Sequence, residues 1–172
     1  MKQSIILFIS VIIFYILLGQ VTSYVIPDDA IRIRVIANSD SAYDQEIKNK
    51  VKTKVQYQMY DLLKDTKGSS EAREVINANL GSINNNVEDI LLANNYKLGY
   101  HINYGLNYFP AKEYKGTTYD EGYYESLVIT LGNGEGNNWW CVLFPPLCLL
   151  EAEDATDVEY TSYVKELIDK YL

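Results

Sequence analysis

Few residues of this 172-residue chain are of types that perform nucleophilic or metal-assisted chemistry. The chain has one histidine, His101, and two cysteines, Cys141 and Cys148. A cysteine nucleophile needs a nearby base that converts the thiol to a thiolate, and no sequence spacing brings His101 close to either cysteine. Three such ligands are also too few for a four-coordinate cysteine and histidine zinc site, although composition leaves carboxylate-bound metals open. We therefore expect no catalytic residue, no metal site and no cofactor.

Acidic side chains are the remaining candidates for catalysis. Asp40 and Glu135 are two such carboxylates, and a pair of carboxyl groups about 5 to 10 Å apart would serve a glycosidase. The sequence does not set the distance between them. An extracytoplasmic cell-wall hydrolase that uses such acidic residues is therefore the alternative to a protein without enzymatic activity.

The overall charge excludes one class of partner. Lysine and arginine number 15 against 23 aspartate and glutamate residues, which gives a formal net charge of −8. Proteins that hold a phosphate backbone by counterion release need a basic field. We therefore expect no nucleic-acid partner.

The N-terminus has the order of an export signal. Met1-Lys2 gives a short positive start, and residues 5–18 are almost wholly apolar. Ser23 suits the last position before a cleavage site, so residues 1–23 are expected to be a signal peptide or, in the alternative, an uncleaved signal anchor. In both cases residues 24–172 are exported.

The first half of the exported part has a strand followed by helices. Residues 31–36 alternate apolar side chains with two arginines, which is the period of a half-buried strand. Apolar residues at spacings of three and four then predict an amphipathic helix over 43–62. Two further helices are expected on either side of Gly81-Ser82, with apolar residues from Ala72 to Leu80 and from Ile83 to Leu91, and Asn94-Asn95 is expected to end the helical half.

The second half has strand periodicity. Residues 96–108 alternate tyrosine and aliphatic side chains with polar ones, over a length that predicts a bulge or bend at Gly99 or Gly105. The tyrosine face is expected to cover the helices, with an aromatic binding ladder as the alternative, and His101 falls on the polar face as a surface histidine. A second strand is expected over 123–131, and the glycines after it predict a hairpin turn instead of a phosphate-binding loop.

Residues 137–150 hold both tryptophans, both cysteines and two of the four prolines. One interpretation is a buried central strand over 139–144 that the prolines terminate. The other is that residues 145–150 form an exposed apolar patch that docks on a membrane protein or bilayer surface. Because the chain is exported and the prolines let it turn back, Cys141 and Cys148 are expected to form a disulfide, with a catalytic thiol as the alternative.

Together these elements predict an α/β fold with α+β character. Its form is a single two-layer domain, with helices packed on a mixed, largely antiparallel sheet. We place this exported α/β domain at residues 24–150. Residues 151–172 are expected to be an acidic linker and a short C-terminal helix.

Three stretches together resemble the stage II sporulation protein R family of endospore-forming bacteria. They are residues 31–40 (IRIRVIANSD), the amphipathic helix that follows, and residues 134–148 (GEGNNWWCVLFPPLC). The specific part runs from Trp139-Trp140-Cys141 to the Pro-Pro-Leu-Cys sequence at its end. The resemblance covers about residues 27–150.

The resemblance implies an exported signalling protein, and we expect residues 24–150 to be a protein ligand without enzymatic activity. It implies export from the forespore into the forespore/mother-cell intermembrane space, where the protein activates a membrane-embedded aspartic protease of the mother cell. That protease matures the precursor of the mother-cell sigma factor. A contact with the membrane surface is also expected.

The positions that match the family's motifs, and are unusual for plain structure, are the candidates for contact with this protease. They join the turn after the first strand to the loop and strand around Trp139. The partner-binding candidates are Asn38, Ser39, Asp40, Glu135, Asn138, Trp139, Trp140, Phe144, Pro145, Pro146 and Leu147. Replacement of Asp40 or Glu135 is expected to abolish signalling and to leave folding intact.

Overall fold

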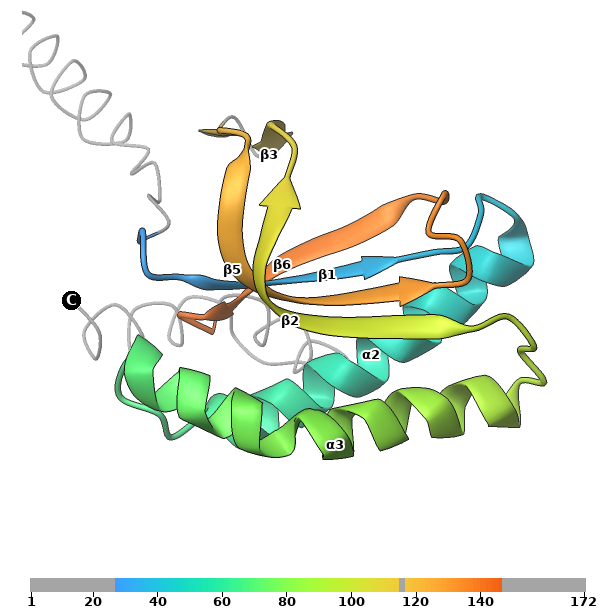
Figure 1. Cartoon of the computed structure of the whole chain (residues 1–172), viewed down its shortest axis with the longest axis horizontal. Coiled ribbons are helices and arrows are strands. Elements are labelled where there is room, and N and C mark those ends of the chain that lie inside the picture. Colours follow the sequence, from blue (N-terminus) through green and yellow to red (C-terminus); the bar gives the residue numbers. More distant parts are fainter. Residues whose placement is uncertain (1–26, 115–116, 147–172) are drawn as a thin grey trace, which may run out of the picture.

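Two helices pack on one face of a four-stranded sheet (Figure 1). The structure, a computed structural model, describes residues 27–114 and 117–146. The elements are β1 (Ile31–Ile36), α2 (Ala42–Leu63), α3 (Ser69–Ala93), β2 (Tyr100–Phe109), β3 (Lys112–Tyr114), β4 (Thr117–Tyr119), β5 (Gly122–Leu131) and β6 (Asn138–Phe144). The predicted fold class, helices on a mixed sheet in two layers, is confirmed.

The four-stranded sheet has the order β2-β5-β1-β6. β1 pairs in parallel with β5 and antiparallel with β6, and β2 pairs antiparallel with β5. The predicted hairpin after Leu131 is therefore wrong, because β1 lies between β5 and β6. The chain does turn there, with the Gly134 N–H donating to the Leu131 carbonyl at 3.1 Å. A glycine-rich loop predicts a turn but not which strands pair across it.

The helix-facing side of the sheet and the inner sides of both helices make the core. Ile33 of β1 lies opposite Leu127 of β5, and both side chains are 0% exposed. The spacing of apolar residues that predicts α2 is the spacing of its buried face, which comprises Ile47, Val51, Val55, Met59 and Leu63. The burial of these side chains, more than helix propensity, stabilises the two-layer arrangement.

The helix α3 is one continuous helix where two were predicted. Gly81 and Ser82 are exposed and lie inside it. Glycine costs about 1 kcal/mol relative to alanine within a helix. Ile76 and Ile83, one on each side of Gly81, are both 0% exposed in the same core, and this burial outweighs the local preference for a break.

The strand predicted over 96–108 begins at Tyr100 instead. Tyr96 packs in the core ahead of the strand at 8% exposure, after Asn95 turns the chain with a φ of 52°. Tyr100 and Tyr104 pack against the core, as the expected covering of the helices requires, and His101 is exposed.

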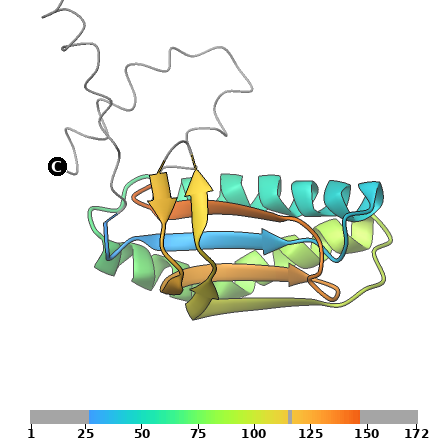
Figure 2. The same ribbon diagram turned by 90° about the horizontal axis from the view of Figure 1, so that it is seen from above.

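The predicted bend occurs at Gly105, where φ is 153°. Beyond it β2 and β5 turn away from the helices and, with the β3–β4 hairpin, form an arm comprising residues 106–114 and 117–125 (Figure 1). Figure 2 shows this arm lying over the helix-free side of the sheet. Leu106 and Tyr108 leave the helix layer with the arm and are 72% and 49% exposed.

The tryptophan strand β6 is an edge strand of the sheet. The interpretation of residues 139–144 as a central strand is therefore wrong, although Val142, Leu143 and Phe144 are buried as that interpretation requires. A run of apolar residues predicts that both faces of a strand are buried. It does not predict how many strands pair with that strand.

Several predictions fall on residues outside those described. They are the signal segment 1–23, the acidic linker and helix 151–172, and the apolar patch from Leu147 onwards. Among the described residues, neither helix has the length and hydropathy of a membrane span.

Candidate functional site

Two loops meet at one end of the sheet, the β1–α2 turn (residues 37–41) and the β5–β6 loop (residues 132–137). The Asn38 side-chain Oδ1 accepts a hydrogen bond from the Asn133 N–H at 3.0 Å. The Asn38 carbonyl accepts another from the Glu135 N–H at 3.1 Å. We call this contact the loop junction; it brings together two sequence motifs almost a hundred residues apart.

The glycines of the β5–β6 loop let the two backbones approach closely. A Cβ atom on Gly136 would lie 2.3 Å from the Ser39 carbonyl oxygen, and one on Gly132 would lie 2.3 Å from the Asn38 Oδ1. Gly132 also has a φ of 54°, which favours glycine. The spacing of these glycines, which resembles a phosphate loop, is therefore explained by the packing of one loop against the other.

Buried Asp44, in the first turn of α2, holds the β1–α2 turn from within. Its Oδ2 accepts hydrogen bonds from the Asn38 Nδ2 at 2.9 Å and from the Ser39 hydroxyl, and Ser41 caps the helix by accepting from the Asp44 N–H at 3.1 Å. The Ser39 hydrogen bond, followed by that of Asn38, lowers the pKa of Asp44 below its ordinary value. The side chains of Asn38 and Ser39 thus stabilise the turn.

Asp40 lies on the outer side of the same turn. Its Oδ1 accepts from the Asn137 N–H at 2.6 Å and from the Gln45 Nε2 at 3.3 Å. Lys48 of α2 reaches the Asn137 carbonyl at 3.3 Å. Asp40 therefore fixes the β5–β6 loop while its side chain remains exposed.

An open pocket of about 480 Å³ lies beside the loop junction. Four of the predicted partner-binding residues, Asp40, Glu135, Asn138 and Trp140, line it. The remaining lining residues are Pro110, Ala111, Lys112, Gly136 and Asn137. The pocket is thus formed where the loop junction, β6 and residues 110–112 of the arm come together.

The two adjacent tryptophans face opposite sides of β6, as side chains on a strand must. Trp139 lies opposite Val35 and packs against the core, with the Lys52 Nζ 5.2 Å from its ring centroid. Trp140 lies opposite Arg34 on the helix-free side. Of the pair, only Trp140 lines the pocket.

The helix-free side carries a cluster of cationic and aromatic side chains, of which only Trp140 is among the predicted partner-binding residues. The Arg34 guanidinium lies 4.1 Å from the centroid of the Trp140 ring, and the Lys112 Nζ lies 5.3 Å from it. The Arg32 guanidinium lies 3.4 Å from the centroid of the Tyr124 ring. We call these residues, with Phe109, the cationic–aromatic cluster.

The arm closes one side of this cluster. Phe109, at the end of β2, reaches across β1 so that its ring centroid lies 5.0 Å from that of Trp140 and 6.0 Å from that of Tyr124. The alternation of two arginines with apolar residues along β1 was the available signal for the cluster. No feature of the sequence predicts that the arm folds over these arginines.

The arginines of the cluster are partly desolvated. Burial lowers the pKa of both Arg32 and Arg34. Among the side chains that the structure describes, no carboxylate lies within salt-bridge distance of either one, and the buried Arg32 Nε has no hydrogen-bond acceptor. The Asn138 amide, with its oxygen turned toward Arg34, accepts from that guanidinium at 2.7 Å.

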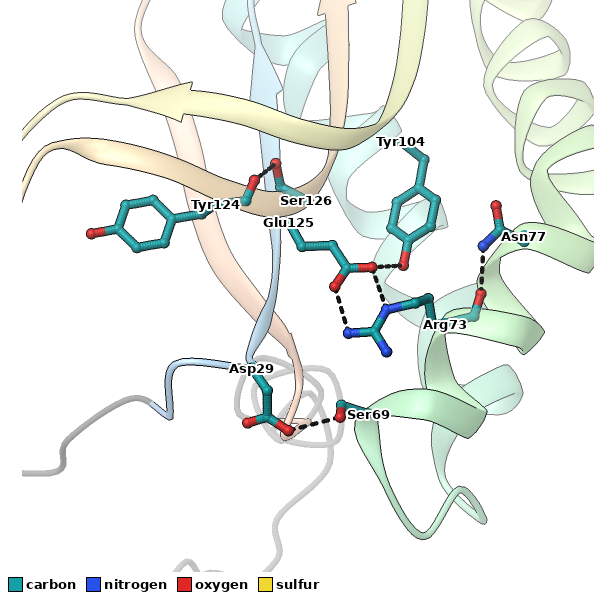
Figure 3. A network of polar contacts seen from close by, with 8 residues as sticks. All are labelled: Asp29, Ser69, Arg73, Asn77, Tyr104, Tyr124, Glu125 and Ser126. Atoms are coloured by element: carbon teal, nitrogen blue, oxygen red, sulfur yellow. Dashed lines mark hydrogen bonds and ion pairs between the residues drawn. The ribbon is translucent and has the colours of Figure 1, made fainter.

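A separate ion pair supports the arm from the helix side (Figure 3). The Arg73 Nε and Nη2 donate to the two carboxylate oxygens of Glu125, each at 2.7 Å, and the Tyr104 hydroxyl donates to Glu125 Oε1 at 2.8 Å. The Arg73 hydrogen bonds are the main cause of a lowered Glu125 pKa. This network ties α3 to the base of the arm; in Figure 3 Tyr124 points away from it.

The remaining partner-binding candidates follow the pocket-lining residue Trp140 in the sequence. Phe144 and Pro146 are buried, and Pro145 is partly exposed. Leu147 lies outside the described residues. Cys141 is not a free cysteine; its expected partner Cys148 also lies outside the described residues, so that pairing stays a prediction.

Comparison with known proteins gives one family. The model of the family described as stage II sporulation protein R matches residues 27–154. A protein of Bacillus subtilis (strain 168) named stage II sporulation protein R is 40% identical over 135 residues, which are 78% of this chain and 60% of that protein. The chain therefore spans about 60% of the length of this curated relative. No solved structure matches the chain.

Proposed function

The chain belongs to the stage II sporulation protein R family, and on this premise we propose that it is an exported ligand that activates a membrane-embedded aspartic protease. The family is one of sporulation proteins, and the matched relative is not named as an enzyme. In the proposal, the ligand acts in the intermembrane space between forespore and mother cell. Activation of the protease then triggers maturation of the mother-cell sigma factor precursor.

One observation of the fold supports a binding role. Asp40, Glu135, Asn138 and Trp140 come from two motifs far apart in the sequence, and they line the same open pocket. The loop junction holds the pocket rim in place by hydrogen bonds at 2.6 to 3.1 Å. A rigid rim lowers the entropy cost of binding, which favours recognition of a protein surface.

Activation requires more than binding. A ligand shifts its target toward the active state only by as much as it binds that state more tightly. The proposed contacts must therefore be stronger with the active arrangement of the protease. Glu135 is a suitable residue for such a contact. Its side chain is exposed at the pocket, and its backbone is fixed because its N–H donates to the Asn38 carbonyl in the loop junction.

The test is reconstitution in a host that does not sporulate. The exported chain, the candidate membrane protease and the sigma factor precursor are produced together, and precursor cleavage is followed on a gel. Cleavage that depends on the exported chain supports the proposal. If all three proteins are present at their expected locations and no cleavage occurs, the proposal fails.

The cell-wall hydrolase is a second candidate because Asp40 and Glu135 line one pocket. Two contacts argue against it. Asp40 Oδ1 is engaged by the Asn137 N–H, and the Trp140 ring, which would stack on a sugar, already contacts Arg34, Lys112 and Phe109. Release of soluble fragments from peptidoglycan by the purified protein, lost on Glu135→Gln, would establish the hydrolase instead.

A further inference from the structure

We propose that the cationic–aromatic cluster binds a single carboxylate side chain, Asp or Glu, presented by an extended segment of the partner protein. The carboxylate lies between Arg34 and Lys112, at the edge of the Trp140 ring. The inference rests on the proposed function for the identity of the partner, whereas the binding chemistry follows from the cluster itself.

The geometry brings positive charges together, and among the described side chains none of these cations forms a salt bridge with a carboxylate. Arg34 and Lys112 both lie against the Trp140 ring, at 4.1 and 5.3 Å from its centroid. Arg32 is two residues from Arg34 on the same face of β1, so the Cα atoms of the two arginines are about 7 Å apart. Like charges this close in a partly dry site repel one another unless an anion compensates them.

The aromatic rings also fix the orientation of the guanidinium groups. A ring stacked on the flat face of a guanidinium leaves its N–H groups directed outward in the plane. In Arg34 the Asn138 amide oxygen occupies the edge formed by Nη2 and Nε, at 2.7 and 3.3 Å. The edge formed by Nη1 and Nη2 is the one left for a ligand. A carboxylate has two oxygens that match this edge in a bidentate pair. The Trp140 contact of Arg34 is therefore an arrangement that prepares the guanidinium for a carboxylate.

The surrounding charge limits what else binds. The protein has a net charge of −8, and Asp40 and Glu135 line the same pocket as Lys112. These carboxylates repel a polyanion such as an acidic run or an anionic lipid surface. A segment with one acidic residue among neutral ones supplies a carboxylate to Arg34 and Lys112 and is repelled less by Asp40 and Glu135.

The test is selection of peptides from a random heptapeptide library on the exported chain, residues 24–172. Peptides retained by the wild-type chain but not by Lys112→Gln or Arg34→Gln are sequenced. We expect one Asp or Glu at a fixed position among otherwise neutral residues. Replacing that residue by Asn or Gln in a synthetic peptide should lower affinity about tenfold to a hundredfold.

Matched controls separate charge from folding. Lys54→Gln removes one exposed positive charge from α2 and should select the same peptides as the wild-type chain. Lys112 is exposed, so Lys112→Gln keeps the test valid even if Arg34→Gln fails to fold. Arg34→Lys keeps the charge but loses the planar pair, and should bind the peptide less tightly than wild type.

Four outcomes would overturn the inference. They are no enrichment over Lys112→Gln, a consensus without an acidic residue, a consensus of several acidic residues together, and tighter peptide binding after deletion of residues 151–172. The last would mean that the chain's own acidic segment occupies the cluster. In the reconstitution assay, normal precursor cleavage with both the Lys112→Gln and the Arg34→Gln variant would contradict this inference alone. Absence of cleavage with the wild-type chain would contradict the proposed function.

Discussion

The two faces of the sheet differ in the kind of side chain that they carry. On the helix-covered face, Ile33 and Leu127 are 0% exposed in an aliphatic core. On the helix-free face, Arg34 on the same strand stacks on Trp140 and is desolvated without an acidic partner among the described residues. One face gains free energy by burying apolar surface, and the other keeps charged groups in a partly dry site. The first face therefore stabilises the fold, and our proposal assigns partner binding to the second.

The largest effect on stability is expected on the helix-covered face. Leu127→Ala leaves a cavity in the core and should lower the free energy of unfolding by about 2 to 5 kcal/mol. Val128→Ala, the neighbouring position on the other face and partly exposed, is the matched control. Urea unfolding followed by circular dichroism measures both, and equal losses would remove the distinction between the faces.

The loop junction should give the next largest effect. In Gly136→Ala the new methyl group meets the Ser39 carbonyl oxygen, so the two loops must separate. We expect a loss of about 1 to 3 kcal/mol in the free energy of unfolding, typical of overpacking. Gly81→Ala, in an open position of α3 with no atom within 4 Å of the added Cβ, should instead be neutral or stabilising.

The Arg73–Glu125 pair should give a smaller, pH-dependent effect. The folded-state pKa of Glu125 is lowered, so the pair stabilises the fold above the unfolded pKa of about 4.3, and this stabilisation is lost as pH falls through the folded-state pKa. Because Arg73 is 40% exposed, solvent screening should limit the contribution to about 1 kcal/mol or less. Glu125→Gln should therefore lower stability at pH 7 more than at pH 3. Unfolding curves at the two pH values measure this, and an equal loss at both would show that the ion pair does not contribute.

The smallest effect on stability is expected at Lys112. Its side chain is exposed at the pocket, so Lys112→Gln should change the free energy of unfolding by less than about 0.5 kcal/mol. The same variant should lose the selected acidic peptide. A large loss of stability with peptide binding retained would reverse the assignment of the two faces.

The sequence predicts the individual helices and strands of this protein better than it predicts which strands pair in the sheet. The strand over 31–36 and the helix after it were predictable from periodicity. Strand length predicted a bend at Gly99 or Gly105, and the structure has it at Gly105. The position of β1 between β5 and β6 was not, since a glycine-rich turn carries no information about a strand inserted from elsewhere in the chain. The helix break predicted at Gly81 was wrong for a related reason. Core packing on both sides of Gly81 outweighs the low helix propensity of glycine.

The candidate site was predictable only in part. Asp40, Glu135, Asn138 and Trp140 stood out as motif residues, and the structure places them around one pocket. The same motifs also included Asn38 and Ser39, whose side chains hold Asp44. A motif does not distinguish residues that build a turn from residues that face a partner. Lys112 and Phe109 were missed because only the folding of the arm brings them to Trp140.

The most direct test of the central claim compares Glu135→Gln with Glu74→Gln in the reconstituted system. Both variants remove one exposed carboxylate, the first at the pocket and the second on α3, away from the pocket lining. If the chain is an activating ligand that uses the pocket, Glu135→Gln should abolish precursor cleavage, with unchanged export and thermal unfolding, and Glu74→Gln should cleave as the wild-type chain does. Normal cleavage with Glu135→Gln would contradict the account.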